Sequence, residues 1–140
     1  MDGFVIGPGA GDSYEFNGGE VCIKAMPEHT GLGGFSVETF PKGFASPWHV
    51  HHRDTGVFFV LEGTMHIRCG ELDALASVGS MIFLPPGVPH AFRVEGDASA
   101  RWFSVQSPHG DFMLSTMARS RQSAAGTKAP AIETLGPPPF

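Results

Sequence analysis

The sequence GFASPWHVHHRDTGVFFVLEG, from Gly43 to Gly63, places two histidines, His49 and His51, in an apolar context rich in β-branched and aromatic residues. Side chains alternate between the two faces of an extended strand, so residues i and i+2 point the same way. We therefore expect the His49 and His51 imidazoles to share one face and His52 to point to the other.

A second stretch, GSMIFLPPGVPH from Gly79 to His90, supplies a third histidine. Its apolar run ends at Pro85-Pro86-Gly87, a turn that cannot continue a strand ladder, and His90 follows directly. Three imidazoles that converge inside a small β fold suit a first-row transition metal. The alternative is that the histidines are structural hydrogen-bonding groups, but the spacing of all three favours a shared interior site.

At these residues the chain resembles the cupin superfamily, in particular the small single-domain bacterial members that are similar to quercetin dioxygenase. Gly43, the His49–His51 pair and Gly63 stand at the spacing of the first family motif. The second motif is matched by Gly79, Pro85, Gly87 and His90, and the closing LGPPPF also looks like the end of these proteins. The resemblance implies an all-β fold, a double-stranded β-helix or cupin jelly-roll barrel, with a short C-terminal helix and a Pro-rich tail.

The family's glutamate ligand has no counterpart in this chain. With a four-residue spacer its position falls on Gly56, and with a three-residue spacer on Thr55. The asparagine of the second motif falls on Val94. The resemblance thus implies a metal site of His49, His51 and His90 without a carboxylate.

The overall composition describes one globular domain. The 140 residues are 41% hydrophobic and 16% charged, and Gly 19 and Pro 12 indicate many tight turns. A net charge of −5 without a Lys/Arg cluster argues against nucleic acid, and no apolar run is long enough for a membrane span. Cys22 and Cys69 form neither a zinc spacing nor a disulfide framework, so with no signal peptide apparent we expect a cytoplasmic protein.

Short strands separated by turn residues predict a β sandwich or barrel. A cupin domain is expected over residues 1–119, followed by a Gly/Ala/Pro-rich tail at 120–140 that packs on the body or on a neighbouring subunit. Residues 1–20 read as an irregular or short-stranded entry segment, and a short helix is expected from Asp111 to about residue 119. The strands are expected at 21–26, 34–40, 48–52, 57–61, 65–69, 72–77, 81–84, 90–94 and 100–106.

Other residues are candidates for the surroundings of the site. His66 alternates with apolar neighbours and is the first reserve ligand, and Asp54 shares the parity of Gly56 and is a replacement carboxylate if it turns inward. Phe58, Val60 and Phe92 share the parity of the ligand positions and are expected to line the pocket, although such residues also simply fill a small barrel.

The resemblance, taken together with these residues, leaves three functions open. The first is a metal-dependent, dioxygenase-type oxidation of a small enol, diketone, aromatic or polyketide-like substrate, with Fe as the expected metal and Ni, Mn, Zn or Cu as alternatives. Because the glutamate that serves as ligand and base in flavonol-cleaving relatives is missing, quercetin itself is not the expected substrate. The second is a non-redox isomerase or cyclase that uses the histidines as acid–base groups. The third is a metal-free small-molecule binding module. The resemblance also implies a homodimer, since small cupins often pair through sheet edges that would otherwise be exposed.

Overall fold

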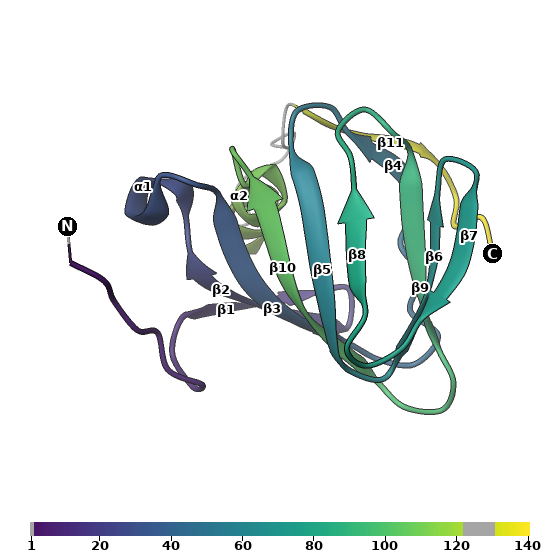
Figure 1. The fold of residues 1–140 in the computed structure, drawn as a ribbon, viewed down its shortest axis with the longest axis horizontal. Coiled ribbons are helices and arrows are strands. Elements are labelled where there is room, and N and C mark those ends of the chain that lie inside the picture. Colours follow the sequence, from purple (N-terminus) through teal and green to yellow (C-terminus); the bar gives the residue numbers. More distant parts are fainter. Residues whose placement is uncertain (1, 122–130) are drawn as a thin grey trace.

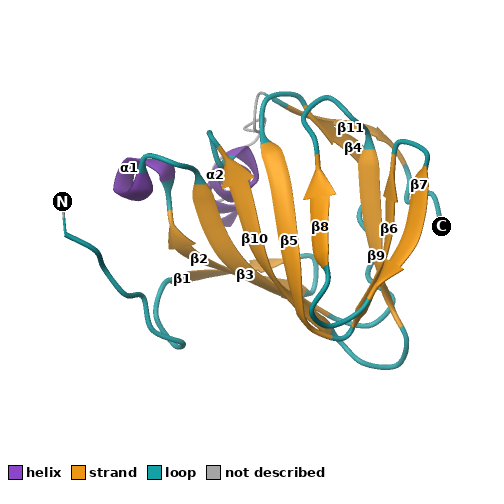
Figure 2. Ribbon diagram, viewed as in Figure 1, coloured by secondary structure: helices purple, strands orange, loops and turns teal. Residues whose placement is uncertain are grey.

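Two antiparallel sheets face each other and form the body of the protein (Figures 1 and 2). The computed structural model describes residues 2–121 and 131–140. The first sheet has the order β1 (Asp12–Phe16), β2 (Gly19–Ala25), β3 (Gly34–Phe40), β10 (Ala100–Ser107), β5 (Thr55–Glu62) and β8 (Met81–Leu84). The second has the order β11 (Ile132–Gly136), β4 (Trp48–His51), β9 (His90–Glu95), β6 (Thr64–Cys69) and β7 (Leu72–Ala76). The helices are α1 (Pro27–Thr30) and α2 (Asp111–Arg121).

This arrangement confirms the predicted jelly-roll barrel with a short C-terminal helix. The strands at 34–40 and 81–84 have the predicted bounds, and the others differ by a residue or two at their ends. Three of the described elements were not predicted as such: β1, inside the segment read as irregular or short-stranded, α1, and β11, inside the predicted tail. Among the described residues, no helix is long and apolar enough to cross a membrane.

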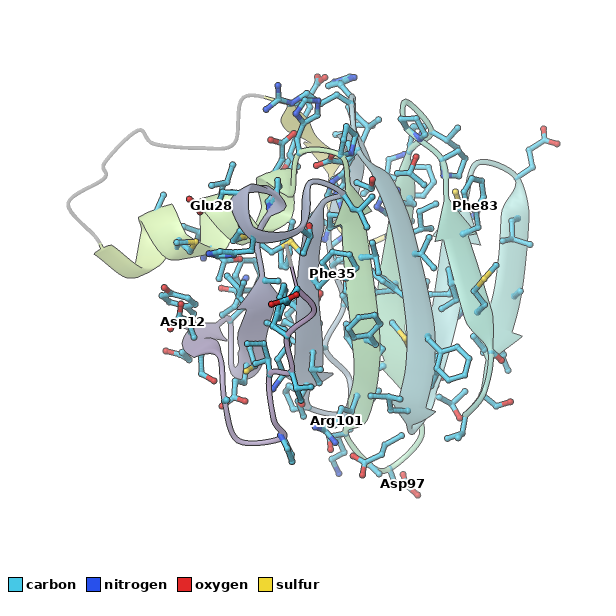
Figure 3. All side chains as sticks on the ribbon, turned by 60° about the vertical axis from the view of Figure 1, so that its left-hand side comes forward. Asp12, Glu28, Phe35, Phe83, Asp97 and Arg101 are labelled. Carbon is cyan, nitrogen blue, oxygen red and sulfur yellow. The ribbon has the colours of Figure 1, made fainter. Side chains whose placement is uncertain are left out.

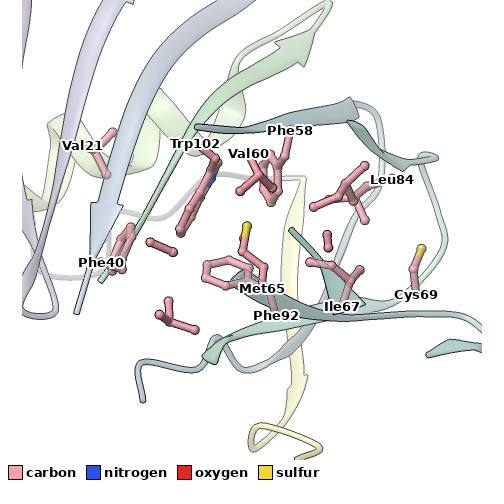
Figure 4. Packing of buried hydrophobic residues seen from close by; sticks show 14 of the residues in the cluster. Val21, Phe40, Phe58, Val60, Met65, Ile67, Cys69, Leu84, Phe92 and Trp102 are labelled. Carbon is pink, nitrogen blue, oxygen red and sulfur yellow. The ribbon is translucent and has the colours of Figure 1, made fainter. Parts of the chain in front are cut away.

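Alternation along the strands builds the core. In β3 and β10 every second residue is buried, because one face of each strand looks into the barrel and the other looks out. Trp102 and Phe40 stack there with ring centroids 5.5 Å apart, and Trp102 is fully buried (Figure 4). Burial of such large apolar side chains supplies much of the driving force for folding.

Glycine is required at the turn between β5 and β6. Gly63 has φ 77°, in the left-handed region, and a Cβ atom there would lie 2.6 Å from the carbonyl oxygen of Ser99. This explains why the apolar run of β5 ends with Glu62-Gly63 and why the chain returns at once into β6.

Residues 132–136 of the expected tail pack on the barrel itself. β11 pairs antiparallel with β4, and Figure 1 shows this last strand beside β4. The Phe140 ring lies against His66 and under the Arg93 guanidinium, at 4.9 and 5.0 Å between centres. Residues 122–130 of the predicted tail lie outside the described residues. The boundary between cupin domain and tail at residue 119 stays a prediction.

Candidate metal centre

Three histidines from two neighbouring strands meet at one place in the barrel. His49 and His51 come from β4, and His90, the first residue of β9, pairs with His49 across the ladder. One nitrogen from each ring lies within 4.8 Å of the other two, and these side chains form a group that can hold a metal ion. The predicted convergence of the three imidazoles is therefore present in the structure.

Backbone hydrogen bonds connect the two motifs that carry these histidines. The Pro85-Pro86-Gly87 turn ends β8, and Gly87 N–H donates to the His51 carbonyl at 2.8 Å. Ahead of β4, Ser46 N–H donates to the Phe92 carbonyl and Phe92 N–H donates to Ser46 Oγ, both at 2.9 Å. The ligand strands are thus fixed to each other on both sides of the site.

The tautomers of two histidines follow from their partners. His49 Nδ1 lies 2.7 Å from the Pro47 carbonyl oxygen, and His90 Nδ1 lies 3.2 Å from the Val88 carbonyl oxygen. A carbonyl oxygen only accepts, so each Nδ1 carries the proton and each Nε2 has a free lone pair. His51 Nδ1 is buried and has no hydrogen-bond partner among the described residues. The neutral rings of His49 and His90 can therefore each offer the Nε2 lone pair to a metal ion.

Burial keeps these rings uncharged. Burial, with a smaller contribution from the neighbouring imidazoles, lowers the pKa of His51 to about 3 and that of His90 to about 4. Burial also lowers the pKa of His49. At neutral pH protons do not compete for the lone pairs of these rings.

The three histidines line a cavity of about 240 Å³ with largely aromatic walls. Phe58 and Phe92 line it, as their parity predicts, whereas Val60, which was expected to do so, is fully buried in the core further along β5. Arg119 of α2 also lines the cavity, donates to Asn17 Oδ1 at 3.3 Å and lies over the Phe16 ring. The remaining aromatic wall is formed by Phe16, Phe40, Phe44 and Phe112.

Glu38 and Gln106 are buried polar residues of the cavity that the sequence reasoning, which found no catalytic base, did not identify. Glu38 of β3 is 3% exposed and accepts a hydrogen bond from Ser36 Oγ at 3.0 Å. Burial raises the pKa of Glu38 to about 7, although its hydroxyl partners act to lower it. Gln106 of β10 is 4% exposed. The alternation of residues 34–40 places Glu38 on one of two faces of a strand. Both faces carry apolar residues, so the sequence alone does not show that the face of Glu38 points into the barrel.

The two reserve ligands lie in other environments. His66 faces outward on β6, where its Nε2 and Nδ1 contact Asp73 and Glu95 at 2.5 and 3.3 Å. The Asp54 carboxylate is buried and accepts the backbone N–H groups of His109 and Asp111 at 2.6 and 2.8 Å. Asp54 therefore holds the chain at the start of α2, and its oxygens are already satisfied.

Gly56, the position of the missing glutamate, lies on β5 between Leu84 of β8 and Gln106 of β10. A Cβ atom at Gly56 would lie 3.4 Å from Gln106 Nε2 and from Leu84 Cβ. The preceding residue, Thr55, has the opposite parity along β5, so it does not replace the glutamate on the inward face.

Comparisons with known proteins agree with this geometry. Among solved structures, TT1209 from Thermus thermophilus is 27% identical, with a TM-score of 0.60 over 68% of this chain and 88% of that chain. A predicted oxalate decarboxylase from Thermotoga maritima is 18% identical (TM-score 0.64; 74% and 97% covered), and KdgF from Halomonas sp. is 20% identical (TM-score 0.64; 73% and 92% covered). These two likenesses show the shared fold.

No curated protein matches the chain. The family profile described as "Cupin domain" matches residues 36–106, which span all of the elements that carry the three histidines and half of the sequence. The chain therefore belongs to the cupin family.

Proposed function

We propose that this cupin binds a divalent transition metal through His49, His51 and His90 and uses it for the oxygen-dependent oxidation of a small organic substrate. The observation that carries the proposal is the hydrogen bond from Nδ1 of His49 and of His90 to a backbone carbonyl. Metal-binding histidines in proteins almost always donate their second ring N–H in this way, which fixes the tautomer and the ring orientation.

The donor set fits a metal ion. Three imidazole nitrogens held neutral by burial suit Fe, Ni, Cu or Zn, and open positions would remain beyond the three protein ligands. Iron is the metal that we propose, with Ni, Mn, Zn and Cu as alternatives. Because no carboxylate belongs to this group of described residues, the full positive charge of the ion stays available to an anionic substrate.

A bound metal of this kind supplies Lewis acidity toward a substrate oxygen and, when it is redox-active, reactivity with dioxygen. The chain itself supplies the surroundings. The six phenylalanines of the cavity offer flat apolar contact, and Arg119 places a positive charge at its wall. With a volume near 240 Å³ the cavity is below the roughly 300–1,000 Å³ of pockets for drug-sized ligands. We therefore propose a compact enol, diketone or aromatic substrate that ionises to an anion.

Metal analysis of freshly purified protein, followed by oxygen uptake with diketones, phenols and thiols, tests this function. We expect about one metal ion per chain and substrate-dependent oxygen consumption that a chelator abolishes. Purified protein that contains no metal and takes up none from solution would overturn the proposal.

A second candidate, a non-redox isomerase or cyclase, is favoured by Glu38. A buried carboxyl group with a pKa about 7 exchanges protons readily at neutral pH, as general acid–base catalysis requires. Turnover under anaerobic conditions separates the two, since the oxidation needs dioxygen and the isomerisation does not. Tight binding of a small molecule without any turnover would favour the third function, a metal-free binding module.

We also propose that two chains form a homodimer through the outer surface near β7 and β8. Both are edge strands, and Leu75, Met81 and Phe83 are exposed there by 68%, 65% and 54%; Figure 3 shows Phe83 on the outside of the barrel. Exposed apolar residues on unpaired edges favour pairing. Light scattering of the protein and of its Phe83→Asp variant tests this, with a monomer expected for the variant. We also propose a cytoplasmic location. Cys22 and Cys69 are both free, as is usual for proteins of a reducing compartment.

A further inference from the structure

The Gln106 side chain carries a buried acceptor that nothing in the described part of the chain satisfies. The residue is 4% exposed, and its Oε1 has no hydrogen-bond partner within residues 2–121 and 131–140. In the same ranges the one hydrogen bond of its Nε2 is long, 3.4 Å to Ser104 Oγ. Burying an amide oxygen without a partner costs free energy, so native proteins rarely keep such an atom unless something outside the chain pairs with it.

The strands on either side of Gln106 place glycines opposite it. In the register of the first sheet, Gln106 lies opposite Gly34 of β3 and opposite Gly56 of β5. Neither glycine has a side chain that could bond to the amide or cover it. A Cβ atom at Gly56 would touch Nε2 at 3.4 Å, which shows that the amide lies directly over the Gly56 backbone.

The cavity in front of Gln106 is the one that contains the three histidines. The unpaired atom is an acceptor, so it requires a cation or a donor, and the imidazoles that line the same cavity are neutral rings whose nitrogens lie close enough together to hold a cation. Amide oxygens are suitable ligands for the harder first-row metals. Ser104 on the same strand explains the placement of Nε2 but leaves the oxygen unexplained.

We propose that Gln106 Oε1 is a fourth protein ligand of the metal held by His49, His51 and His90. The inference rests on the metal-binding part of the proposed function. A neutral amide completes the ligand set without cancelling any positive charge, unlike a carboxylate. Gln106 thereby sets how strongly the centre attracts an anionic substrate.

Titration of the metal-free protein with Co²⁺ tests the ligand directly, by calorimetry for the affinity and by visible absorption for the coordination number. Gln106→Met keeps the length of the side chain but removes the oxygen, and Gln106→Glu replaces the amide with a carboxylate of the same shape. Ser104→Ala is the matched control, because it removes the one contact that Nε2 makes among the described residues and leaves Oε1 in place. Circular dichroism and thermal melting establish that each variant is folded.

We expect Gln106→Met to weaken Co²⁺ binding at least about tenfold, the lower end of the losses known for partner groups of metal sites, and to change the absorption bands. Gln106→Glu should bind Co²⁺ more tightly than the wild type. The Co²⁺ affinity of Ser104→Ala should lie within about threefold of the wild-type affinity. Equal affinity and identical spectra of Gln106→Met and wild type would overturn this inference alone, as would an equal loss in Ser104→Ala. If Gln106→Met does not fold, the Co²⁺ affinity of Gln106→Glu tests the inference: tighter binding than the wild type supports it, and equal or weaker binding overturns it. Failure of the wild type to bind Co²⁺ would remove the proposed metal function as well.

Discussion

His49 and His90 lie opposite each other on β4 and β9, and the centroids of their rings are 4.5 Å apart. The distance between these ligand side chains is therefore set by the register of a strand ladder. A slip of one residue would turn one of the imidazoles to the other face, so the geometry of the site and the pairing of the strands are the same property of the fold.

Removal of one imidazole should abolish stable metal binding. We expect His90→Ala to lose most of its bound metal, since two remaining nitrogens on one strand cannot enclose an ion. Elemental analysis after dialysis measures the loss. His66→Ala is the control, because His66 lies on the outer face with Asp73 and Glu95; equal metal loss in that variant would contradict the assignment.

Glu38 should make the metal-free protein less stable as the pH rises. The pKa of this carboxyl group is raised to about 7, so between pH 4.5 and 7 the folded state keeps a proton that the unfolded state releases. Stability then falls with increasing pH, by about 3 kcal/mol in total at 1.36 kcal/mol per pKa unit. Glu38→Gln should remove this loss and be the more stable protein at pH 8.

Urea unfolding at pH 5 and pH 8 measures this effect. The comparison of the two proteins isolates Glu38, because the lowered pKa values of the histidines affect both equally and act in the opposite direction. A constant difference in stability between the proteins at both pH values would show that Glu38 does not titrate in this range.

Asp54 should be a stability residue without a role in metal binding. Its carboxylate accepts two backbone N–H groups and is 1% exposed, so Asp54→Ala leaves buried donors without partners. We expect a loss of about 2–4 kcal/mol in the free energy of unfolding, measured with urea. Asp97→Ala, in an exposed turn, should change stability by less than about 0.5 kcal/mol.

A carboxylate at position 56 should strengthen the centre. The contacts of a Cβ atom at Gly56 are no shorter than 3.4 Å, so a Cβ atom fits there in ordinary van der Waals contact with Leu84 and Gln106. We expect Gly56→Glu to bind divalent metal more tightly than Gly56→Ala, which controls for the added Cβ. Calorimetry measures both affinities, and a weaker affinity for Gly56→Glu would mean that the position does not face the ion.

The sequence contained most of the information for the barrel and for the three histidines. The alternation at 34–40 and the proline turn before His90 are local patterns, and they predict local structure well. Glu38 and Gln106 escaped notice because the face that a strand residue occupies depends on its neighbours in the sheet, as does the difference between Val60 in the core and Phe58 at the cavity. The pairing of β11 with β4 joins residues some 80 positions apart, which no local pattern encodes.

The pairing of β11 with β4 has a consequence for biosynthesis. Thr134 lies beside His49 and Ile132 beside His51, and both tail residues form part of the cavity wall. During synthesis on the ribosome, the edge of β4 that pairs with β11 would stay unpaired until residue 136 has emerged from the exit tunnel. Loading of the centre is then coupled to the synthesis of β11, and a nascent chain that stalls before this strand would expose an incomplete pocket to the cell.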